Sequence, residues 1–313
     1  MSSISTYVLG ITQLSTQSSI MTSVIQAEDG SFPLGSPLSL RLDGKNTLTT
    51  FRILRNFTPF TRGQVYLVRP ESHEDFPSPL ILKVYDPKFR SDRFLPRRSR
   101  PWLLSVETIA VVLREHGVIT HDFHPLDIDI MFPWHWEANF INNSELSFKQ
   151  EVLAYKNLVE LQGRFIPKFY ASGRLPPSNS RTIEPGALLI EYIPGVTLHD
   201  IDPALVLPEL YQPLIEAVAT FHKHGVIHYD INGHNIMFVP PEAPERAVII
   251  DFGETCTRLE GESDEEWDSI PQADVAHLRM SLENRLGTRL DVLALMRKHQ
   301  GARWLYLLEN ERE

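Results

Sequence analysis

The sequence predicts an α+β fold, with a small antiparallel sheet in the N-terminal part and a mainly helical C-terminal part. Three short apolar runs rich in strand-forming residues come first, at residues 48–54, 64–68 and 80–85. Two longer segments, 208–224 and 271–286, then repeat apolar residues at the spacing of a helix face. The 313 residues are enough for two lobes around a cleft, which we place at 46–192 and 193–313.

Residues 1–45 are assigned to an N-terminal extension. They are rich in Ser and Thr and carry no recognisable motif. The scattered apolar residues leave two alternatives open, either one or two strands or a partly unstructured segment.

Composition excludes several classes of partner. Apolar content of 42% and charged content of 22% are ordinary for a soluble globular protein. The net charge of −10 argues against nucleic acid as the main partner. No apolar run is long enough to span a membrane, and the first forty residues lack the Lys and Arg of a secretory leader. Cys256 is the only cysteine, so we expect a reducing compartment, either cytoplasmic or nuclear.

The most informative stretch runs from His228 to Asn235 and is followed by Asp251, Phe252 and Gly253. Between the two motifs lie short apolar runs at 236–239 and 247–250, separated by a proline-rich turn, which predict a hairpin. This order is typical of phosphoryl transfer, which needs an Asp to orient the attacking hydroxyl and two further side chains to hold a metal. A plain acidic loop beside a hairpin is the alternative.

The residue types fit that chemistry. The charge on a transferred phosphoryl group is neutralised by Mg²⁺, which prefers oxygen ligands. Asp251 supplies the charged ligand and Asn235 the neutral one. Asp230 then accepts the proton of the acceptor alcohol or aligns its hydroxyl.

These motifs resemble the catalytic and metal loops of the protein-kinase-like superfamily, which includes eukaryotic protein kinases, aminoglycoside phosphotransferases and choline kinases. The similarity covers about residues 51–255 and is sharpest over 186–255. It implies a bilobal kinase-like fold, with ATP and Mg²⁺ at the site and an insertion at 86–146 after the third strand. It also implies that His228 braces the metal loop without transferring a proton.

Lys83 is the charged residue inside the third predicted strand. Alternation along that strand places Ile81, Lys83 and Tyr85 on one face, and a lysine among apolar neighbours needs an anion. The resemblance implies that Lys83 holds the α- and β-phosphates and pairs with a glutamate on the next helix. We choose Glu151 over Glu145 and Glu160 because a capping-box pattern at 147–150 predicts a helix there. The alternative is an edge-strand lysine that blunts aggregation.

The resemblance assigns the remaining nucleotide contacts. Gly63 and Val65 match the glycine-rich loop, although Thr58 and Phe60 stand where two further glycines are expected. Ile81 replaces the alanine over adenine, which predicts a tighter pocket. The hinge falls at Glu191, Tyr192 and Ile193, whose backbone groups would bind adenine.

The 86–146 insertion carries three features. Residues 90–100 are strongly basic, and we interpret them as a solvated linker rather than a docking site. Residues 101–116 show helical amphipathicity. A metal site around His121 and His124 is conceivable, but the spacing fits no known zinc pattern, so we expect the nearby aromatic residues to pack the insertion onto the N-terminal lobe.

Several positions depart from protein kinases. Tyr229 replaces the arginine that reads activation-loop phosphate, and Asn232 replaces the lysine that steadies the γ-phosphate. Only sixty residues follow Gly253, without an Ala-Pro-Glu motif. An acidic segment takes its place and could attract a cationic acceptor, through Glu260, Glu262, Asp264, Glu265, Glu266 and Asp268.

Two hypotheses follow for the function. The first is a kinase that moves the γ-phosphate of ATP, with Mg²⁺, to a hydroxyl of a small molecule or a protein. The alternative is a nucleotide-binding pseudokinase that acts as a protein-interaction module. It is favoured by the poor phosphate loop and by Asn232. Reuse of the fold for nucleotidyl transfer is a third, less favoured option. We expect neither nucleic acid nor a membrane as partner.

Overall fold

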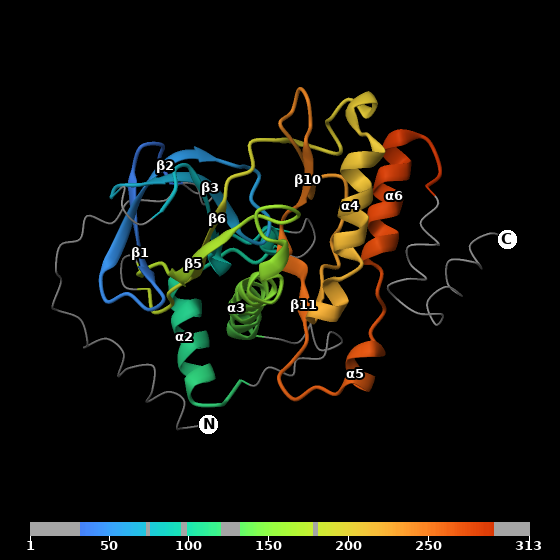
Figure 1. Ribbon diagram of the computed structural model, residues 1–313. Coiled ribbons are helices and arrows are strands. Elements are labelled where there is room, and N and C mark those ends of the chain that lie inside the picture. Colours follow the sequence, from blue (N-terminus) through green and yellow to red (C-terminus); the bar gives the residue numbers. More distant parts are fainter. Residues whose placement is uncertain (1–31, 73–75, 95–98, 120–131, 178–180, 291–313) are drawn as a thin grey trace, which may run out of the picture.

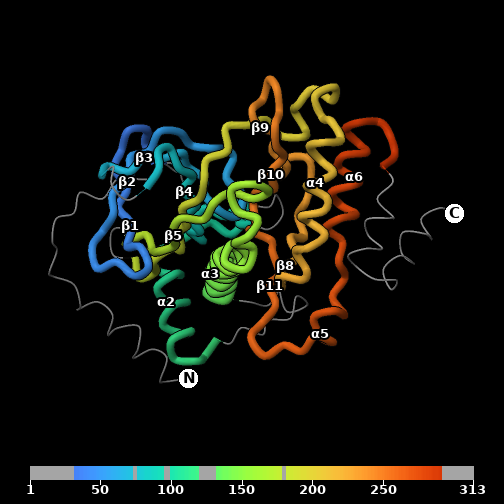
Figure 2. Tube along the Cα trace, in the orientation of Figure 1, coloured from blue at the N-terminus to red at the C-terminus, as the bar shows by residue number. Residues whose placement is uncertain are grey.

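The computed structural model describes residues 32–72, 76–94, 99–119, 132–177 and 181–290. In these ranges the chain is α+β, with a β-barrel at one end and paired helices at the other (Figure 1). The helix α3 runs between the two and is seen almost end-on in the same orientation in Figure 2.

Six antiparallel strands form the closed barrel, in the order β1-β2-β3-β4-β6-β5. The sequence predicted a small antiparallel sheet, and the strand pairing closes that sheet on itself. The strands are β1 (Pro37–Leu42), β2 (Leu48–Asn56), β3 (Gln64–Pro70), β4 (Leu80–Tyr85), β5 (Phe169–Arg174) and β6 (Gly186–Glu191).

The closing strand β1 lies inside the segment assigned to the N-terminal extension. It pairs with β2 on one side and with β5 on the other. Its residues alternate in burial, with Leu38, Leu40 and Leu42 in the barrel core. The sheet therefore begins before the predicted boundary at residue 46. The alternating pattern of β1 was the available signal, and the Ser- and Thr-rich residues before it obscured that signal.

The strand β4 alternates as predicted. Leu80, Leu82 and Val84 are fully buried in the barrel core. Because successive side chains of a strand point to opposite faces, Ile81 and Lys83 are directed away from that core. This geometry delivers Lys83 to the outside of the barrel, toward the helical part.

The helix α3 (Pro133–Asn157) carries Glu151 and corrects the predicted helix start at 147. Ser147 is buried within the helix and so cannot cap its N-terminus. The buried face already includes Phe140 and Ile141, upstream of the apparent capping box. The predicted end of the insertion at residue 146 thus falls inside α3, which packs against β4, β5 and β6.

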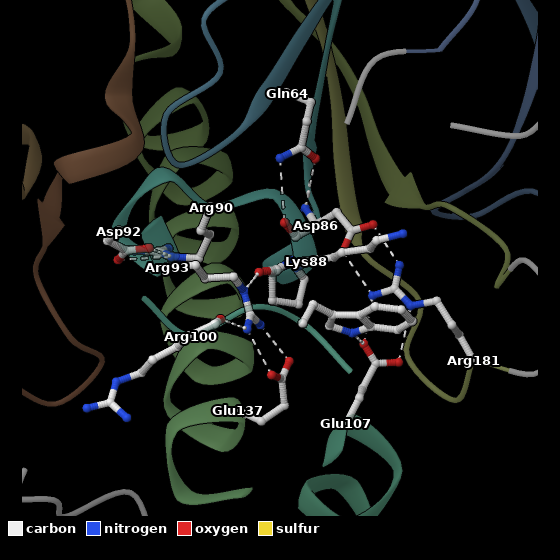
Figure 3. Close-up of polar contacts among 12 residues, drawn as sticks. Gln64, Asp86, Lys88, Arg90, Asp92, Arg93, Arg100, Glu107, Glu137 and Arg181 are labelled. Carbon is white, nitrogen blue, oxygen red and sulfur yellow. Dashed lines mark hydrogen bonds and ion pairs between the residues drawn. The ribbon is translucent and has the colours of Figure 1, made fainter. Parts of the chain in front are cut away.

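The rest of the insertion is fixed to the barrel by buried ion pairs (Figure 3). Arg181 bonds to Asp86, directly after β4, at 2.7 Å, and to Glu107 in α2 (Leu104–Glu115) at 2.8 Å. Arg93 bonds to Glu137 of α3 at 2.9 Å.

These contacts correct the interpretation of residues 90–100 as a solvated linker. Arg90 and Arg93 are almost fully buried, because carboxylates of Asp92 and Glu137 neutralise them. The conceivable metal site around His121 and His124 lies outside the described residues.

The helical part surrounds two small sheets. Helices α4 (Pro208–Val218) and α6 (Asp274–Leu286) pack together beside the predicted hairpin of β9 (Ile236–Val239) and β10 (Arg246–Ile249), which is confirmed. The helix predicted at 208–224 ends at Val218, and a separate 3-10 turn follows at Phe221–His224. The remaining elements are β7 (Val196–Thr197), β8 (Val226–Ile227), β11 (Cys256–Thr257) and α5 (Asp264–Asp268).

None of the helices in the described ranges combines the length and the apolar character that a membrane crossing requires.

Closure of the barrel depends on a glycine at the β1–β5 contact. A Cβ atom at Gly173 would collide with the backbone carbonyl oxygen of Arg41 in β1. We expect Gly173→Ala to lower the free energy of unfolding by about 1–3 kcal/mol, as overpacking does. Denaturant unfolding measures this. Gly233→Ala is the matched control, since its nearest contact would lie at an ordinary 3.6 Å. An unchanged midpoint for Gly173→Ala would show that β1 and β5 do not meet.

Candidate active site

A cavity of about 350 Å³ lies between the barrel and the β9–β10 hairpin. Its size falls within the usual range for small-molecule sites. Its lining brings together most of the residues singled out from the sequence, namely Val65, Ile81, Lys83, Glu151, Glu191, Tyr192, Ile193, Asn235 and Asp251. Further apolar side chains line it, among them Phe57, Ile190, Met237 and Ile250.

Lys83 lies between two carboxylates. Its ammonium donates to Glu151 at 2.8 Å and to Asp251 at 2.5 Å. Burial by itself lowers the pKa of Lys83, but the two carboxylates outweigh burial, so the pKa is raised and the side chain is a cation. The structure thus pairs Lys83 with Glu151 rather than with Glu145, which bonds instead to Arg174.

The two carboxylates differ in their surroundings. Glu151 is fully buried, and burial raises its pKa to about 7 although Lys83 opposes the shift. For Asp251, burial also acts to raise the pKa, but the charge of Lys83 prevails and the pKa is lowered. The Asp251 side chain keeps 43% of its surface accessible and lines the cavity. Asp251 is therefore the carboxylate available to a ligand.

The loop that holds Asp251 has an unusual backbone. Asp251 adopts the left-handed conformation, with φ of 64°, which is uncommon for a residue with a side chain. It also begins the 3-10 turn η8 (Phe252–Glu254), where its carboxylate accepts the Gly253 amide at 3.3 Å. Residues with such backbone strain cluster at functional sites, where the surrounding structure holds them in place.

Asp230 is fixed by the two asparagines of its own loop. Its carboxylate accepts from Asn232 Nδ2 at 3.0 Å and from Asn235 Nδ2 at 2.9 Å. This geometry holds the Asp230 side chain in one orientation. It also leaves the Asn235 Oδ1 as the amide atom that could ligate a metal, since the nitrogen is engaged with Asp230.

The backbone of this loop is held from beneath by two side chains. The buried His228 ring lies 3.1 Å from the carbonyl oxygen of Ile250, which is the expected brace to the metal loop. Burial lowers the pKa of His228. Asp274, at the start of α6, accepts the amides of His228 at 2.7 Å and of Tyr229 at 3.0 Å.

Sequence reasoning missed Asp274. In the sequence it is an acidic residue in the first turn of a predicted helix, which is an ordinary position for a solvated carboxylate. In the structure Asp274 is buried, with 6% of its surface accessible, and it accepts backbone amides of the loop instead of facing solvent.

The residues at the predicted hinge have separate tasks. The Glu191 carboxylate pairs with Arg246 of β10 at 3.0 Å and accepts the Lys168 amide at 3.0 Å. It therefore ties the end of β6 to the hairpin. Tyr192 and Ile193 follow β6 and line the cavity.

Gly63 lies against Lys83 and not in the cavity lining. A Cβ atom at Gly63 would come within 3.2 Å of the Lys83 side chain. The preceding residue, Arg62, forms an ion pair with Glu254, directly after the Asp-Phe-Gly motif. This contact was not foreseen from the sequence, and it places a second cation beside the loop that carries Asp251.

A divalent metal would find suitable oxygen ligands here. Asn235 and Asp251 both line the cavity, and a magnesium ion completes its shell with phosphate oxygens and water. In the described part of the chain no group of three or more His, Cys, Asp or Glu side chains forms a metal site by itself.

Removal of Asp274 tests how far the loop depends on it. Asp274→Ala leaves two buried backbone amides without an acceptor, so we expect the free energy of unfolding to fall by about 3 kcal/mol. Denaturant unfolding measures this. Asp268→Ala, at a side chain that is 66% accessible, is the control and should change stability by less than about 0.5 kcal/mol. Equal effects of the two variants would contradict the role given to Asp274.

One protein family and one individual protein match parts of this chain. Residues 208–299 match the family described as lipopolysaccharide kinase (Kdo/WaaP). A stretch of 72 residues is 33% identical to serine/threonine-protein kinase pkn2 of Myxococcus xanthus, and it covers 21% of this chain and 9% of that protein. The family match spans α4, the loop of Asp230, the loop of Asp251 and α6.

Proposed function

We propose that this protein, a member of the protein-kinase-like superfamily by its motifs and by both of these matches, is an ATP- and magnesium-dependent phosphotransferase with an alcohol acceptor. One observation carries the proposal. A buried lysine bridges Glu151 and the accessible Asp251 at the wall of a cavity that also holds Asn235.

The nucleotide would enter the cavity with its base between apolar walls. Val65, Ile81 and Met237 supply those walls, next to the backbone of Tyr192 and Ile193. The phosphates would then lie toward Lys83, which keeps its positive charge because of its raised pKa. Magnesium, held by Asn235 and Asp251, would supply the remaining neutralisation of phosphate charge.

Asp230 would act on the acceptor. As the acceptor oxygen forms its bond to the γ-phosphorus, its proton passes to the Asp230 carboxylate, and ADP leaves with the electrons of the broken bond. The asparagine contacts hold that carboxylate in one orientation. Orientation of this kind lowers the barrier without any covalent intermediate on the protein.

The acceptor class stays open between a small molecule and a protein. The name of the matching family gives lipopolysaccharide as the acceptor, whereas the name of pkn2 gives serine and threonine. The acidic segment after Gly253 favours a cationic acceptor. Part of its charge is balanced internally, since Asp264 bonds to Arg258 at 2.6 Å.

Metal-dependent nucleotide binding is the first test. With ATP at about 100 times its Kd, we expect stabilisation by about 2.7 kcal/mol in the presence of Mg²⁺. Thermal unfolding with and without Mg²⁺ measures this. In Asp251→Asn the magnesium-dependent part should disappear, because the charged ligand is lost. An equal stabilisation by ATP with and without Mg²⁺ would contradict the assignment of Asn235 and Asp251 as metal ligands.

Turnover is the second test. Asp230→Asn should lower the rate of phosphate transfer from labelled ATP by about 10²–10⁴, the usual contribution of a general base, while ATP binding is retained. Asp200→Asn, at an exposed aspartate outside this loop, is the control. Binding of ATP without transfer to any acceptor of a broad metabolite and peptide panel would favour the pseudokinase instead.

A further inference from the structure

A second cavity, of about 310 Å³, lies beside α3, between α2 and the segment that leads into β6. Its wall includes Ser144 of α3, two helical turns (about 10 Å) before Glu151. Tyr85, which follows Lys83 by two residues in β4, lines it as well. The lining shares the elements α3, β4 and β6 with the candidate nucleotide cavity, but no individual residue.

The cavity contains an arginine with no ionic partner. Arg114 of α2 lines it and makes no ion pair with any residue in the described ranges. Burial lowers the pKa of the Arg114 guanidinium, and the more distant carboxylates of Glu145 and Glu115 only partly oppose this. A partly buried guanidinium of this kind is a ready partner for an anion.

The acids in the lining are already neutralised. Glu145 accepts two bonds from Arg174, at 2.6 and 2.7 Å, and Glu184 accepts two from Arg41, at 3.0 and 2.8 Å. Lys149, whose side chain is 66% accessible at the rim, lies 3.2 Å from Glu145 and pairs with it as well. With both acids paired, Arg114 is the charged side chain of the lining that has no ion pair among the described residues.

A buried hydroxyl points to the same conclusion. Ser144 has only 2% of its surface accessible, and its Oγ has no hydrogen-bond partner among the residues that the structure describes. An unpaired buried hydroxyl costs free energy, so a hydrogen bond to it would favour a ligand at this wall of the cavity. A ligand oxygen would satisfy it.

The cavity is preformed by the ion pairs seen in Figure 3. Arg181 joins Asp86 to Glu107 of α2, and Arg93 joins the segment after β4 to Glu137 of α3. The two helices and the end of β4 are thus held in fixed relation. A ligand would find its partners already in place, which reduces the ordering cost of binding.

We propose that this cavity binds a small molecule with a phosphate or carboxylate group on a compact apolar body. Arg114 and Lys149 hold the charge, and the Ser144 hydroxyl donates to one ligand oxygen. Tyr85, Ile141 and Pro185 pack against the apolar body. The site does not rest on the phosphotransferase proposal, because its occupancy is measured without any transfer.

Two probes distinguish the possible charged groups. Phenyl phosphate and benzoate are titrated against the full chain by ligand-observed NMR, with phenol as the uncharged comparison. We expect saturable binding of at least one anion, and no saturable binding of phenol. Tighter binding of phenyl phosphate assigns a phosphate ligand, and tighter binding of benzoate a carboxylate. Neither anion should be displaced by ATP with Mg²⁺.

Variants locate the binding. Arg114→Gln should weaken it about tenfold, which corresponds to about 1.4 kcal/mol, and Ser144→Ala about threefold. Arg164→Gln, an exposed arginine outside the cavity, should leave it unchanged. Should Arg114→Gln fail to fold, Lys149→Gln at its exposed position takes its place, with about a twofold loss expected.

Three results would overturn the proposal. They are the absence of saturable binding of both anions, equal affinity in the wild type and in the variants of the cavity, and displacement of the bound anion by ATP with Mg²⁺. The last would place the anion in the nucleotide cavity instead.

Discussion

The ammonium group of Lys83 joins three segments that are far apart in the sequence. It starts from β4, bonds to Glu151 on α3 and bonds to Asp251 after β10. A lysine buried without such partners would cost several kcal/mol, so the chain must bring both carboxylates to it. The position of α3 against the barrel and the backbone strain at Asp251 are therefore linked to one charge.

The loop that carries Asp230 is fixed by contacts of a different kind. Its backbone amides are held by Asp274, and its histidine ring lies against the carbonyl of Ile250. The acidic side chain of Asp230 is held by two asparagines of the same loop. Contacts with residues distant in the sequence thus hold the loop backbone, whereas contacts within the loop orient the Asp230 carboxylate.

Much of this arrangement was predictable. The alternation in β4 and the hairpin between the two motifs follow from short-range patterns in the sequence. The pairing of Lys83 with Glu151 was implied by the family resemblance. The predicted start of α3 was wrong because the capping-box pattern at Ser147 lies inside the helix. The burial of Arg93 was not foreseen because its partner, Glu137, is distant along the chain.

The sequence by itself determined which chemical groups are present and in what order, since the spacing of Asp230, Asn235 and Asp251 is set by a loop and a hairpin. Only the tertiary structure decided which partner each charged side chain has. It closed the barrel with β1, paired Glu191 with Arg246, placed Asp274 beneath the loop and left Arg114 at a cavity without an ion pair in the described part of the chain. The physical reason is that a strand or helix pattern fixes the direction of a side chain, whereas the partner of a buried charge comes from another part of the chain.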